Sequence, residues 1–430
     1  MESEQKFRLG TACLKIGSGA TPRGGKEAYK GGATALIRSQ NIYNEGFHRN
    51  GLAYIDDKQA AELSNVEVRA SDVLLNITGD SVARCCQVAN DVLPARVNQH
   101  VAIIRPRSDK LDARFLRYVL VSPLFQSHLL ALASAGATRN ALTKSMIEEL
   151  EVTAPPLAEQ QAIAAVLGAL DDKIELNRRM NATLEAMARA LFQSWFVDFD
   201  PVRANLDRRA PSGLDSATAA LFPASFRESE LGRIPKDWTV GKVGDLATLN
   251  RDAVNPGDFP TETFDHFSLP AFDAGRTAKV ELGIAIMSNK LVVKPNSVLL
   301  SKLNPHIPRI WLPDLDAMRR SVCSTEFMVA SSKPGVTREY LFSLFTSSAF
   351  ASVYGTLVTG TTGSHQRIRS ESVFAMPVSI PPRTLIQAFT AIAKPLFDHV
   401  NRNTEQSRTL ATIRDTLLPR LLSRGLKPPD

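Results

Sequence analysis

The chain contains one internal repeat, and its two copies lie about 226 residues apart. The string VTAPPLAEQQAIAAV, which starts at residue 152, corresponds to VSIPPRTLIQAFTAI, which starts at residue 378. Two other pairs keep nearly the same spacing: SDVLLNITG from 71 with NSVLLSKLN from 296, and RFLRYVLVSPLF from 114 with EYLFSLFTSSAF from 339. Proteins that stack small units have periods of about 20–50 residues. The repeat therefore predicts two copies of a unit that consists of a whole domain followed by a helix.

A long helix is expected after each Pro-Pro pair, because proline is tolerated at the start of a helix but not inside it. Apolar residues then recur at alternating steps of four and three, the heptad pattern of a helix that packs along another helix. Asn177 and Asn181 in the first copy, and Asn403 and Ser407 in the second, are polar members of this seam and could fix its register. The apolar seam positions are Ile163, Leu167, Leu170, Ile174, Leu184 and Leu191, and then Phe389, Leu396, Val400, Leu410 and Leu417.

A helix with so narrow an apolar stripe needs a partner. From residue 158 to 196 the first helix would be roughly 58 Å long, at about 1.5 Å per residue. Two sequential copies of a domain followed by a helix favour an antiparallel pair of helices with a globular domain at each end. The alternative is that each helix packs only on its own domain.

The segments outside the helices have the pattern of mixed α and β structure. Short apolar runs bounded by glycine or proline, such as DVLLNITG and KLVVKPNSVLL, predict strands, whereas RFLRYVLVSPLFQSHLLALA predicts helix. The expected fold class is α+β: two similar mixed α/β domains and two long antiparallel helices, related by a pseudo-two-fold repeat. The predicted boundaries are 1–154 for the first domain, 155–197 for the first helix, 198–228 for a linker, 229–380 for the second domain and 381–426 for the second helix.

Composition is that of a folded cytoplasmic protein. The 430 residues are 44% hydrophobic, and the longest apolar run, AIAAVLGAL, is about half of the roughly 18 residues that a membrane span needs. The four cysteines form neither a CxxC pair nor a spaced framework, which indicates reduced thiols. A net charge of +7 is consistent with a polyanionic partner.

Motifs for catalysis are incomplete in this sequence. Asp198 and Asp200 could bind Mg²⁺ through their carboxylates, yet no third acid and no lysine or histidine base lies beside them. The string ATPRGGKE, from residue 20, lacks the first glycine and the Ser/Thr of a phosphate-binding loop, and the seven histidines have no zinc-ligand spacing. We predict no catalytic residue and no metal ligand. A Mg-dependent nuclease that uses Asp198 and Asp200 remains an alternative.

Polar and basic loops, by contrast, occur at similar places in both predicted domains. Their side chains are those that proteins use to read DNA: arginine and lysine contact guanine edges and phosphates, and asparagine and glutamine contact adenine. For any one residue a solvated loop position is the alternative. The first-domain candidates are Thr21, Arg23, Lys26, Arg38, Gln40, Asn41, Thr78, Arg84, Arg96, Asn98, Gln99, Thr138 and Arg139. The second-domain candidates are Lys302, Asn304, His306, Arg309, Thr362, Ser364, His365, Gln366 and Arg367.

Over nearly its whole length the sequence resembles the DNA specificity subunits of type I restriction-modification enzymes. The string PPLAEQQAIAAVLGALDDKIELNRRMNATLEAMARALFQSWFVDFDPV resembles the family's central helical region, and this part of the resemblance is highly specific. GATPRGGKEAY resembles a loop of the family's first domain, LGRIPKDWTVGKVGDLA the entry to its second domain, and TGTTGSHQRI a loop before its second helix. The segment NRDAVNPGDFP lacks the Thr-Pro-Arg-Gly-Gly pattern of the first domain, so the two domains are expected to read different sequences.

The resemblance implies two target recognition domains that each read one half of a bipartite, asymmetric DNA site, with the helices setting the spacer. It implies that the chain is not itself an enzyme and has no cofactor of its own. The implied partners are double-stranded DNA, two adenine methyltransferase (modification) subunits that use S-adenosylmethionine, and two restriction subunits that use ATP and Mg²⁺. A stand-alone DNA-binding protein with a coiled-coil spacer is the other class of function left open.

The string LFQSWFVDFDPV, from residue 191, ends the first predicted helix. In the repeat, Leu191 and Trp195 close the seam, while Phe192 and Phe196 add apolar surface beside it. The second copy has LLPRLLSRGL at this place, so the two aspartates are not part of the repeated unit. We therefore expect a helix terminus that packs against the partner helix or a methyltransferase subunit.

Overall fold

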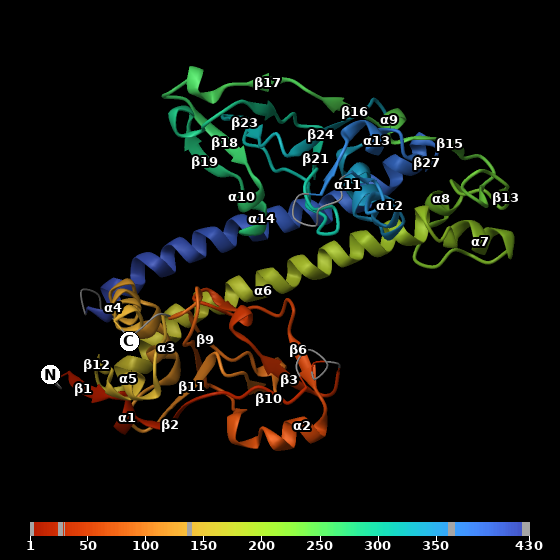
Figure 1. The fold of residues 1–430 in the computed structure, drawn as a ribbon. Helices are drawn as coiled ribbons and strands as arrows, with labels where there is room; N and C mark the ends of the chain where they lie inside the picture. The colour runs from red at the N-terminus through yellow and green to blue at the C-terminus, as the bar shows by residue number, and fades with distance from the viewer. Residues whose placement is uncertain (1–3, 25–28, 30, 136–139, 360–365, 424–430) are drawn as a thin grey trace. The chain divides into compact units, whose positions relative to one another are not determined.

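The computed structural model describes residues 4–24, 29, 31–135, 140–359 and 366–423. The chain divides into two compact units (Figure 1). The first unit is residues 1–176 together with 406–430, and the second is residues 177–405. Both long helices cross this division, so each unit contains one globular domain and a segment of each helix.

The first domain is built around two four-stranded sheets within its described residues. One has the order β2 (Cys13–Ser18), β11 (Val101–Pro106), β8 (Val73–Asn76), β9 (Cys85–Gln87). The other has the order β6 (Ala53–Ile55), β3 (Thr34–Ile37), β10 (Ala95–Val97), β7 (Glu67–Val68), with β3 and β10 parallel. Alternate residues of β8 face different cores: Val73 and Leu75 pack toward the helices, and Leu74 packs toward the second sheet. This two-sided burial explains its uninterrupted apolar run.

Helices cover the outer face of the β2-containing sheet. They are α3 (Ala113–Val121) and α4 (Pro123–Ser134), and they begin where Asp112 and Ser122 cap the free backbone N–H groups. No single helix among the described residues is long and apolar enough to cross a membrane; α3 and α4, bent by 72°, meet that test only as a pair and only by length and composition. The remaining elements are β1 (Gln5–Arg8), which pairs with β12 (Glu151–Ala154), the hairpin β4 (Ile42–Tyr43) and β5 (Gly46–Phe47), and helices α1 (Leu9–Ala12), α2 (Asp57–Glu62) and α5 (Lys144–Glu149).

The second domain repeats this plan. One sheet has the order β16 (Ala247–Asn250), β24 (Phe327–Ser332), β21 (Ser297–Ser301), β22 (Ile310–Trp311). The other has the order β17 (Ala253–Val254), β20 (Lys290–Val292), β23 (Arg320–Cys323), β18 (Thr263–Phe267), β19 (Lys279–Leu282), with β18 and β23 parallel. The further elements are β15 (Thr239–Lys242) paired with β27 (Pro377–Ile380), β25 (Val358–Thr359) paired with β26 (Arg367–Ile368), and helices α9 (Val243–Leu246), α10 (Leu269–Asp273), α11 (Arg338–Thr346), α12 (Ser348–Tyr354) and α13 (Ser370–Phe374).

The sequence repeat is thus a structural repeat, which confirms the expected fold class. The long helices α6 (Leu157–Phe196) and α14 (Arg383–Leu422) are each 40 residues long, and their starts are about 226 residues apart. Even the helix caps are repeated, because Thr337 and Ser347 cap α11 and α12 at the places equivalent to Asp112 and Ser122.

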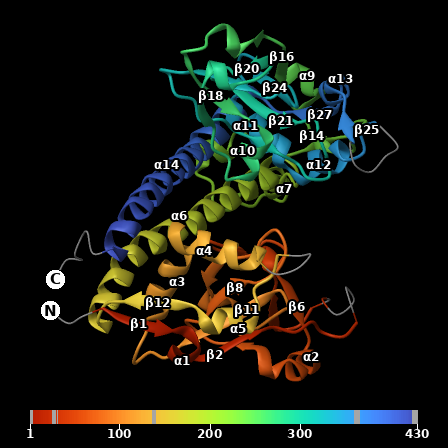
Figure 2. The ribbon, with the colours of Figure 1, turned by 60° about the vertical axis from the view of Figure 1, so that its left-hand side comes forward.

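Within each unit, α6 and α14 lie side by side and run antiparallel (Figures 1 and 2). In the second unit, Asn177 Nδ2 donates to Asn403 O at 3.3 Å, and Asn403 Nδ2 donates to Asn181 Oδ1 at 2.9 Å. Asn177, Asn181 and Asn403 therefore bind one another across the helix pair. In the first unit, Arg414 of α14 donates to Asp171 of α6 at 2.8 Å.

The apolar seam positions are all buried or half-buried. Ile163 and Leu167 lie in the core of the first domain, and Phe389 lies in the core of the second. The two readings of the helices are therefore not exclusive: α6 and α14 pair with each other and also pack on the domain of the unit in which each segment lies.

The end of α6 belongs to the second unit. Phe192 and Phe196 lie in one core cluster with Trp238, Tyr340 and Phe389, and the Phe196 and Tyr340 ring centroids are 5.2 Å apart. The aromatics of the LFQSWF string therefore contact the partner helix, as expected, and also the second domain, which the periodicity of α6 alone did not predict.

After Phe196 the chain turns sharply. Phe199 adopts a left-handed conformation (φ 57°), and the next helix, α7 (Asp200–Leu206), begins with Asp200 in its first turn. The predicted linker also contains α8 (Ser216–Ala219) and β13 (Phe226–Arg227), which pairs with β14 (Ile234–Pro235). Val202 and Phe222 are buried, so this segment packs on the second domain rather than crossing solvent.

Candidate nucleic-acid interface

In the first domain, loops that are distant in the sequence meet at one end of the two sheets. Backbone hydrogen bonds join Ala20 N to Val97 O at 3.0 Å and Ile77 N to His100 O at 3.0 Å. Thr78 forms an isolated β-bridge with Ala141. We call this set of loops, residues 19–23, 38–41, 76–84, 97–100 and 140–142, the first loop cluster. It includes part of each first-domain segment in which the sequence predicts DNA contacts.

The second domain has an equivalent set. Leu303 forms an isolated β-bridge with Arg367, at the places that correspond to Thr78 and Ala141 in the repeat. Asn304 N donates to Gln366 O at 3.0 Å, and Lys302 N donates to Glu326 O at 2.8 Å. We call residues 301–309, 324–326 and 366–368 the second loop cluster. The same backbone scaffold thus presents two different sets of side chains.

Some predicted residues of the first loop cluster have side chains open to solvent. Thr21, Arg23 and Gln99 are exposed. Gln99 Nε2 lies 3.2 Å from His100 Nε2, and the Thr78 hydroxyl lies 2.7 Å from His100 Nδ1. His100, which was not a predicted contact, therefore links two residues that were, and its place directly after Gln99 was the available signal.

Other predicted residues are occupied by the fold. Asn41 is fully buried, and its Nδ2 donates to His48 O at 2.9 Å, so it stabilises a turn and cannot reach a base edge. Asn98 is 7% exposed, and its Oδ1 accepts a hydrogen bond from His100 N at 3.2 Å. Both amides are therefore buried and already have backbone partners, as buried polar groups generally do, and direct DNA contact by Asn41 and Asn98 stays a prediction.

Three predicted arginines of the first domain are half-buried and have partners. Arg96 Nε donates to Ala60 O at 3.1 Å, and Arg38 Nη2 donates to Gly51 O at 2.5 Å. The guanidinium of Arg84 lies 4.8 Å from the centroid of the Tyr43 ring. The exposed Gln40 also donates to Gly51 O, at 3.1 Å. To contact DNA, these side chains would have to exchange an existing partner.

Three predicted residues of the second loop cluster, Arg309, Arg367 and Lys302, have charged or backbone partners. The Arg309 guanidinium donates to both carboxylate oxygens of Asp273, at 2.7 and 2.9 Å, and this hydrogen bonding raises the pKa of Arg309. Arg367 Nη2 lies 2.7 Å from Glu326 Oε1. Burial lowers the pKa of Lys302, whose Nζ donates to Thr325 O at 2.7 Å. Asn304 has a left-handed backbone (φ 51°), and His306 is exposed.

Six predicted residues lie outside the described part of the chain: Lys26, Thr138, Arg139, Thr362, Ser364 and His365. Their role as DNA contacts stays a prediction.

The two aspartates that were considered as a Mg²⁺ site make local contacts at the end of α6 and the start of α7. No cluster of three or more His, Cys, Asp and Glu side chains among the described residues could hold a metal ion. Asp198 Oδ1 accepts a hydrogen bond from Gln193 Nε2 at 3.0 Å, and Asp200 lies in the first turn of α7, where a negative charge favours the helix. Burial raises the pKa of the Cys13 and Cys86 thiols to about 12, so neither is a ready nucleophile.

A buried ionic cluster joins both long helices to the first domain, and the sequence did not predict it. Asp171 Oδ2 accepts hydrogen bonds from Arg117 Nη1 and from the Tyr118 hydroxyl, both at 2.6 Å, while Asp171 Oδ1 accepts one from Arg414 Nη1 at 2.8 Å. Burial would raise the pKa of Asp171, but Arg117, Tyr118 and Arg414 outweigh it, so the pKa lies below its ordinary value. The available sequence signal was Arg414, a charged residue four positions after the seam residue Leu410 and three before Leu417.

The known proteins to which this chain is similar are DNA specificity subunits of type I restriction enzymes. Residues 2–186 match the family described as "Type I restriction modification DNA specificity domain". The type I restriction enzyme MjaIX specificity subunit of Methanocaldococcus jannaschii is 26% identical over 426 residues, which covers 96% of this chain and 91% of the relative. The HindI specificity subunit of Haemophilus influenzae is 23% identical and covers 84% of this chain and 90% of the relative.

A crystal structure of the type I restriction-modification S subunit from M. genitalium has the same fold. Its TM-score is 0.58 at 13% identity, with 100% of this chain and 96% of the other covered.

Proposed function

Since the chain belongs to the specificity subunits of type I restriction-modification systems, we propose that it recognises a bipartite, asymmetric DNA sequence for such a complex. The first domain reads one half of the site, and the second domain reads the other. In this family the specificity subunit recognises DNA and is not itself catalytic. Because its target is DNA, we expect the protein to act in the cytoplasm.

One observation carries the proposal: the two loop clusters share a scaffold but differ in their side chains. The bridges Thr78–Ala141 and Leu303–Arg367 occupy equivalent places in the repeat. Around them the first cluster presents Thr21, Arg23 and Gln99, whereas the second presents His306 and an Arg367–Glu326 pair. Because base contacts depend on side-chain type and position, two such surfaces read two different half-sites.

We further propose that the repeat supplies two docking surfaces for two adenine methyltransferase subunits, and through them for two restriction subunits. One chain that binds two identical partners needs two similar surfaces. Met187 of α6 and Ile413 of α14 are at equivalent positions of the repeat, and they are 53% and 42% exposed. Their equivalence in the repeat, rather than the exposure of either residue alone, makes them candidates for a repeated protein contact. S-adenosylmethionine, ATP and Mg²⁺ then act in the partner subunits, and the long helices set the DNA spacer.

The test is to map methylated adenines in host DNA with and without this gene. In a host with a working methyltransferase partner, loss of one bipartite motif supports the proposal, and an unchanged methylation map refutes it. A variant with Arg23 and Gln99 both changed to alanine should alter methylation at one half-site only. The purified chain should neither cut nor methylate DNA by itself; Mg-dependent cleavage that is lost on Asp198→Ala would instead support a nuclease.

A further inference from the structure

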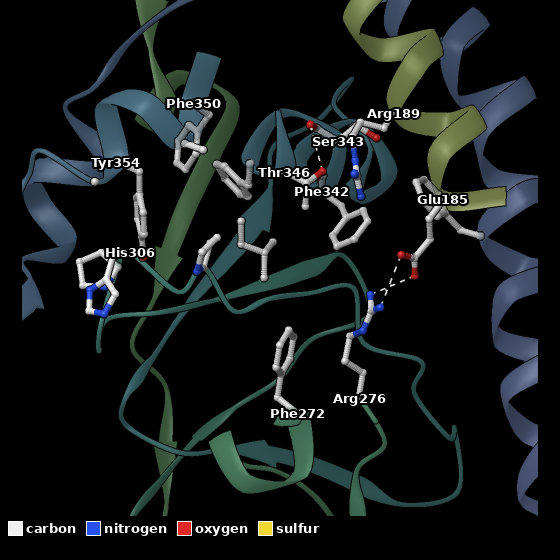
Figure 3. A pocket seen from close by; sticks show the side chains of 17 residues that line it. Glu185, Arg189, Phe272, Arg276, His306, Phe342, Ser343, Thr346, Phe350 and Tyr354 are labelled. Carbon is white, nitrogen blue, oxygen red and sulfur yellow. Dashed lines mark hydrogen bonds and ion pairs between the residues drawn. The ribbon is translucent and has the colours of Figure 1, made fainter. Parts of the chain in front are cut away.

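The second unit contains a cavity of about 530 Å³ (Figure 3). Aromatic rings from α11, α12 and α14 form much of its wall, namely Phe342, Phe345, Phe350, Tyr354 and Phe397. Glu185 and Arg189 of α6 lie at its edge with Arg276, which follows α10. The volume is that of a pocket that can enclose a small ligand or a few side chains.

In the first unit, the equivalent place is filled by the chain itself. The tip of the β4–β5 hairpin enters there, and three neighbours bind Asn44. Asn44 Nδ2 donates to Gln126 Oε1 at 3.2 Å, Cys85 N donates to Asn44 Oδ1 at 2.9 Å, and Arg117 Nη2 donates to Asn44 O at 2.6 Å. One loop residue is thus held by β9, α3 and α4 together.

In the second copy of the repeat, the two side chains that bind Asn44 are replaced by apolar ones, and isoleucine stands at the position of Cys85, whose backbone N–H binds Asn44. Phe342 stands at the place of Arg117, Ala351 at that of Gln126, and Ile310 at that of Cys85, and all three line the cavity. Phe397 stands at the place of Asp171, and its ring packs perpendicular to that of Phe342 at a centroid distance of 5.3 Å. The site that receives a polar loop in one domain is therefore an open apolar site in the other.

We propose that this cavity is a socket for a loop of a partner polypeptide, which inserts an aliphatic or aromatic side chain and places a carboxylate next to Arg189. In the first unit, the equivalent place receives a polypeptide loop. The positive charge of Arg189 at the edge of the cavity favours an acidic residue beside the inserted side chain of the partner loop. Arg276 is paired with Glu185 at 3.0 Å, and the Arg189 guanidinium is the other positive charge among the described residues that line the cavity edge. The inference rests on the proposed function, in which the partner is the methyltransferase subunit.

The test measures the affinity of the full-length chain for the methyltransferase subunit of the same host. Ala351→Trp fills the cavity from its exposed wall, and Ser352→Trp adds the same bulk at the neighbouring exposed position, which does not line the cavity. Arg189→Glu reverses the charge, and Arg189→Lys preserves it. We expect A351W and R189E to weaken binding at least tenfold, with S352W and R189K close to the wild type and all four melting temperatures unchanged.

Each other outcome overturns the inference. Equal binding of the methyltransferase subunit by A351W and the wild type would refute the proposed socket but would not contradict the proposed function. A loss of DNA affinity in A351W, without a loss of methyltransferase affinity, would assign the cavity to DNA. If the wild type does not bind the methyltransferase subunit at all, the proposed docking fails and the socket with it.

Discussion

Removal of the Asp171 carboxylate should destabilise the first unit strongly. The Asp171, Arg117 and Arg414 side chains are 15%, 6% and 12% exposed, so Asp171→Ala leaves the buried Arg117 without its anion and leaves Arg414 with only the exposed Asp415. Breaking a buried ion pair by removing one partner costs about 3–5 kcal/mol. The neighbouring Asp172 pairs with Arg114 but is 69% exposed, and a pair of that kind contributes about 0.2–1 kcal/mol. Asp172→Ala is therefore a matched control, one residue away on the same helix.

The assay is equilibrium unfolding in urea, followed by a probe in the first unit, because a chain with two units can unfold in more than one transition. We expect the free energy of unfolding to fall by about 3–5 kcal/mol for D171A and by no more than about 1 kcal/mol for D172A. The pKa of Asp171 is lowered in the folded chain. Its contribution is therefore complete above the unfolded-state pKa of about 3.9 and is lost as the pH falls through the folded-state value. Equal effects of D171A and D172A at pH 7 would refute this reasoning.

Three further predictions concern other parts of the chain. Phe196→Ala should lower the free energy of unfolding of the second unit by about 3–5 kcal/mol, measured by the same urea titration, because Phe196 is 5% exposed within an aromatic core; a loss below about 1 kcal/mol would contradict that packing. Asn403→Leu should lower the free energy of unfolding by about 1–3 kcal/mol, because it removes the donor to Asn181 Oδ1 within the helix pair; an unchanged value in the urea titration would argue against this contact. Arg23→Ala should weaken DNA binding and lower the slope of log K against log salt by about one, as expected for one lost phosphate contact, and an unchanged slope would exclude that contact.

The sequence predicted the parts of this molecule that depend on periodicity. The 226-residue repeat indicated two domains and two helices, and the heptad spacing placed the first helix at residues 158–196, against Leu157–Phe196 in the structure. Polar residues at matching seam positions indicated contacts between the helices, and Asn177, Asn181 and Asn403 make them. The repeat is a comparison of the chain with itself, and the heptad spacing is a pattern along each helix, so one sequence is enough to read both.

The loops were predictable in position but not in chemistry. Their polar composition marked the segments that meet in the two loop clusters, yet Asn41 and Gln99 look alike in the sequence, and the first is buried while the second is exposed. Whether an amide faces solvent depends on which backbone groups lie beside it, and those of Asn41 come from the turn at 48–50.

The sequence by itself thus determined the repeat, the helix pair and the class of fold, because hydrophobic spacing follows from the geometry of each helix and strand. Only the tertiary structure decided how the charged and aromatic residues are used. From the sequence, Asp171 would be expected to be an exposed acid like its neighbour Asp172. In the structure its partners come from α3, 54 residues away, and from α14, 243 residues away. The equivalent site in the second unit holds Phe397 against Phe342 and leaves a cavity. Partners at such separations leave no periodic trace, and they become visible only once the chain has folded.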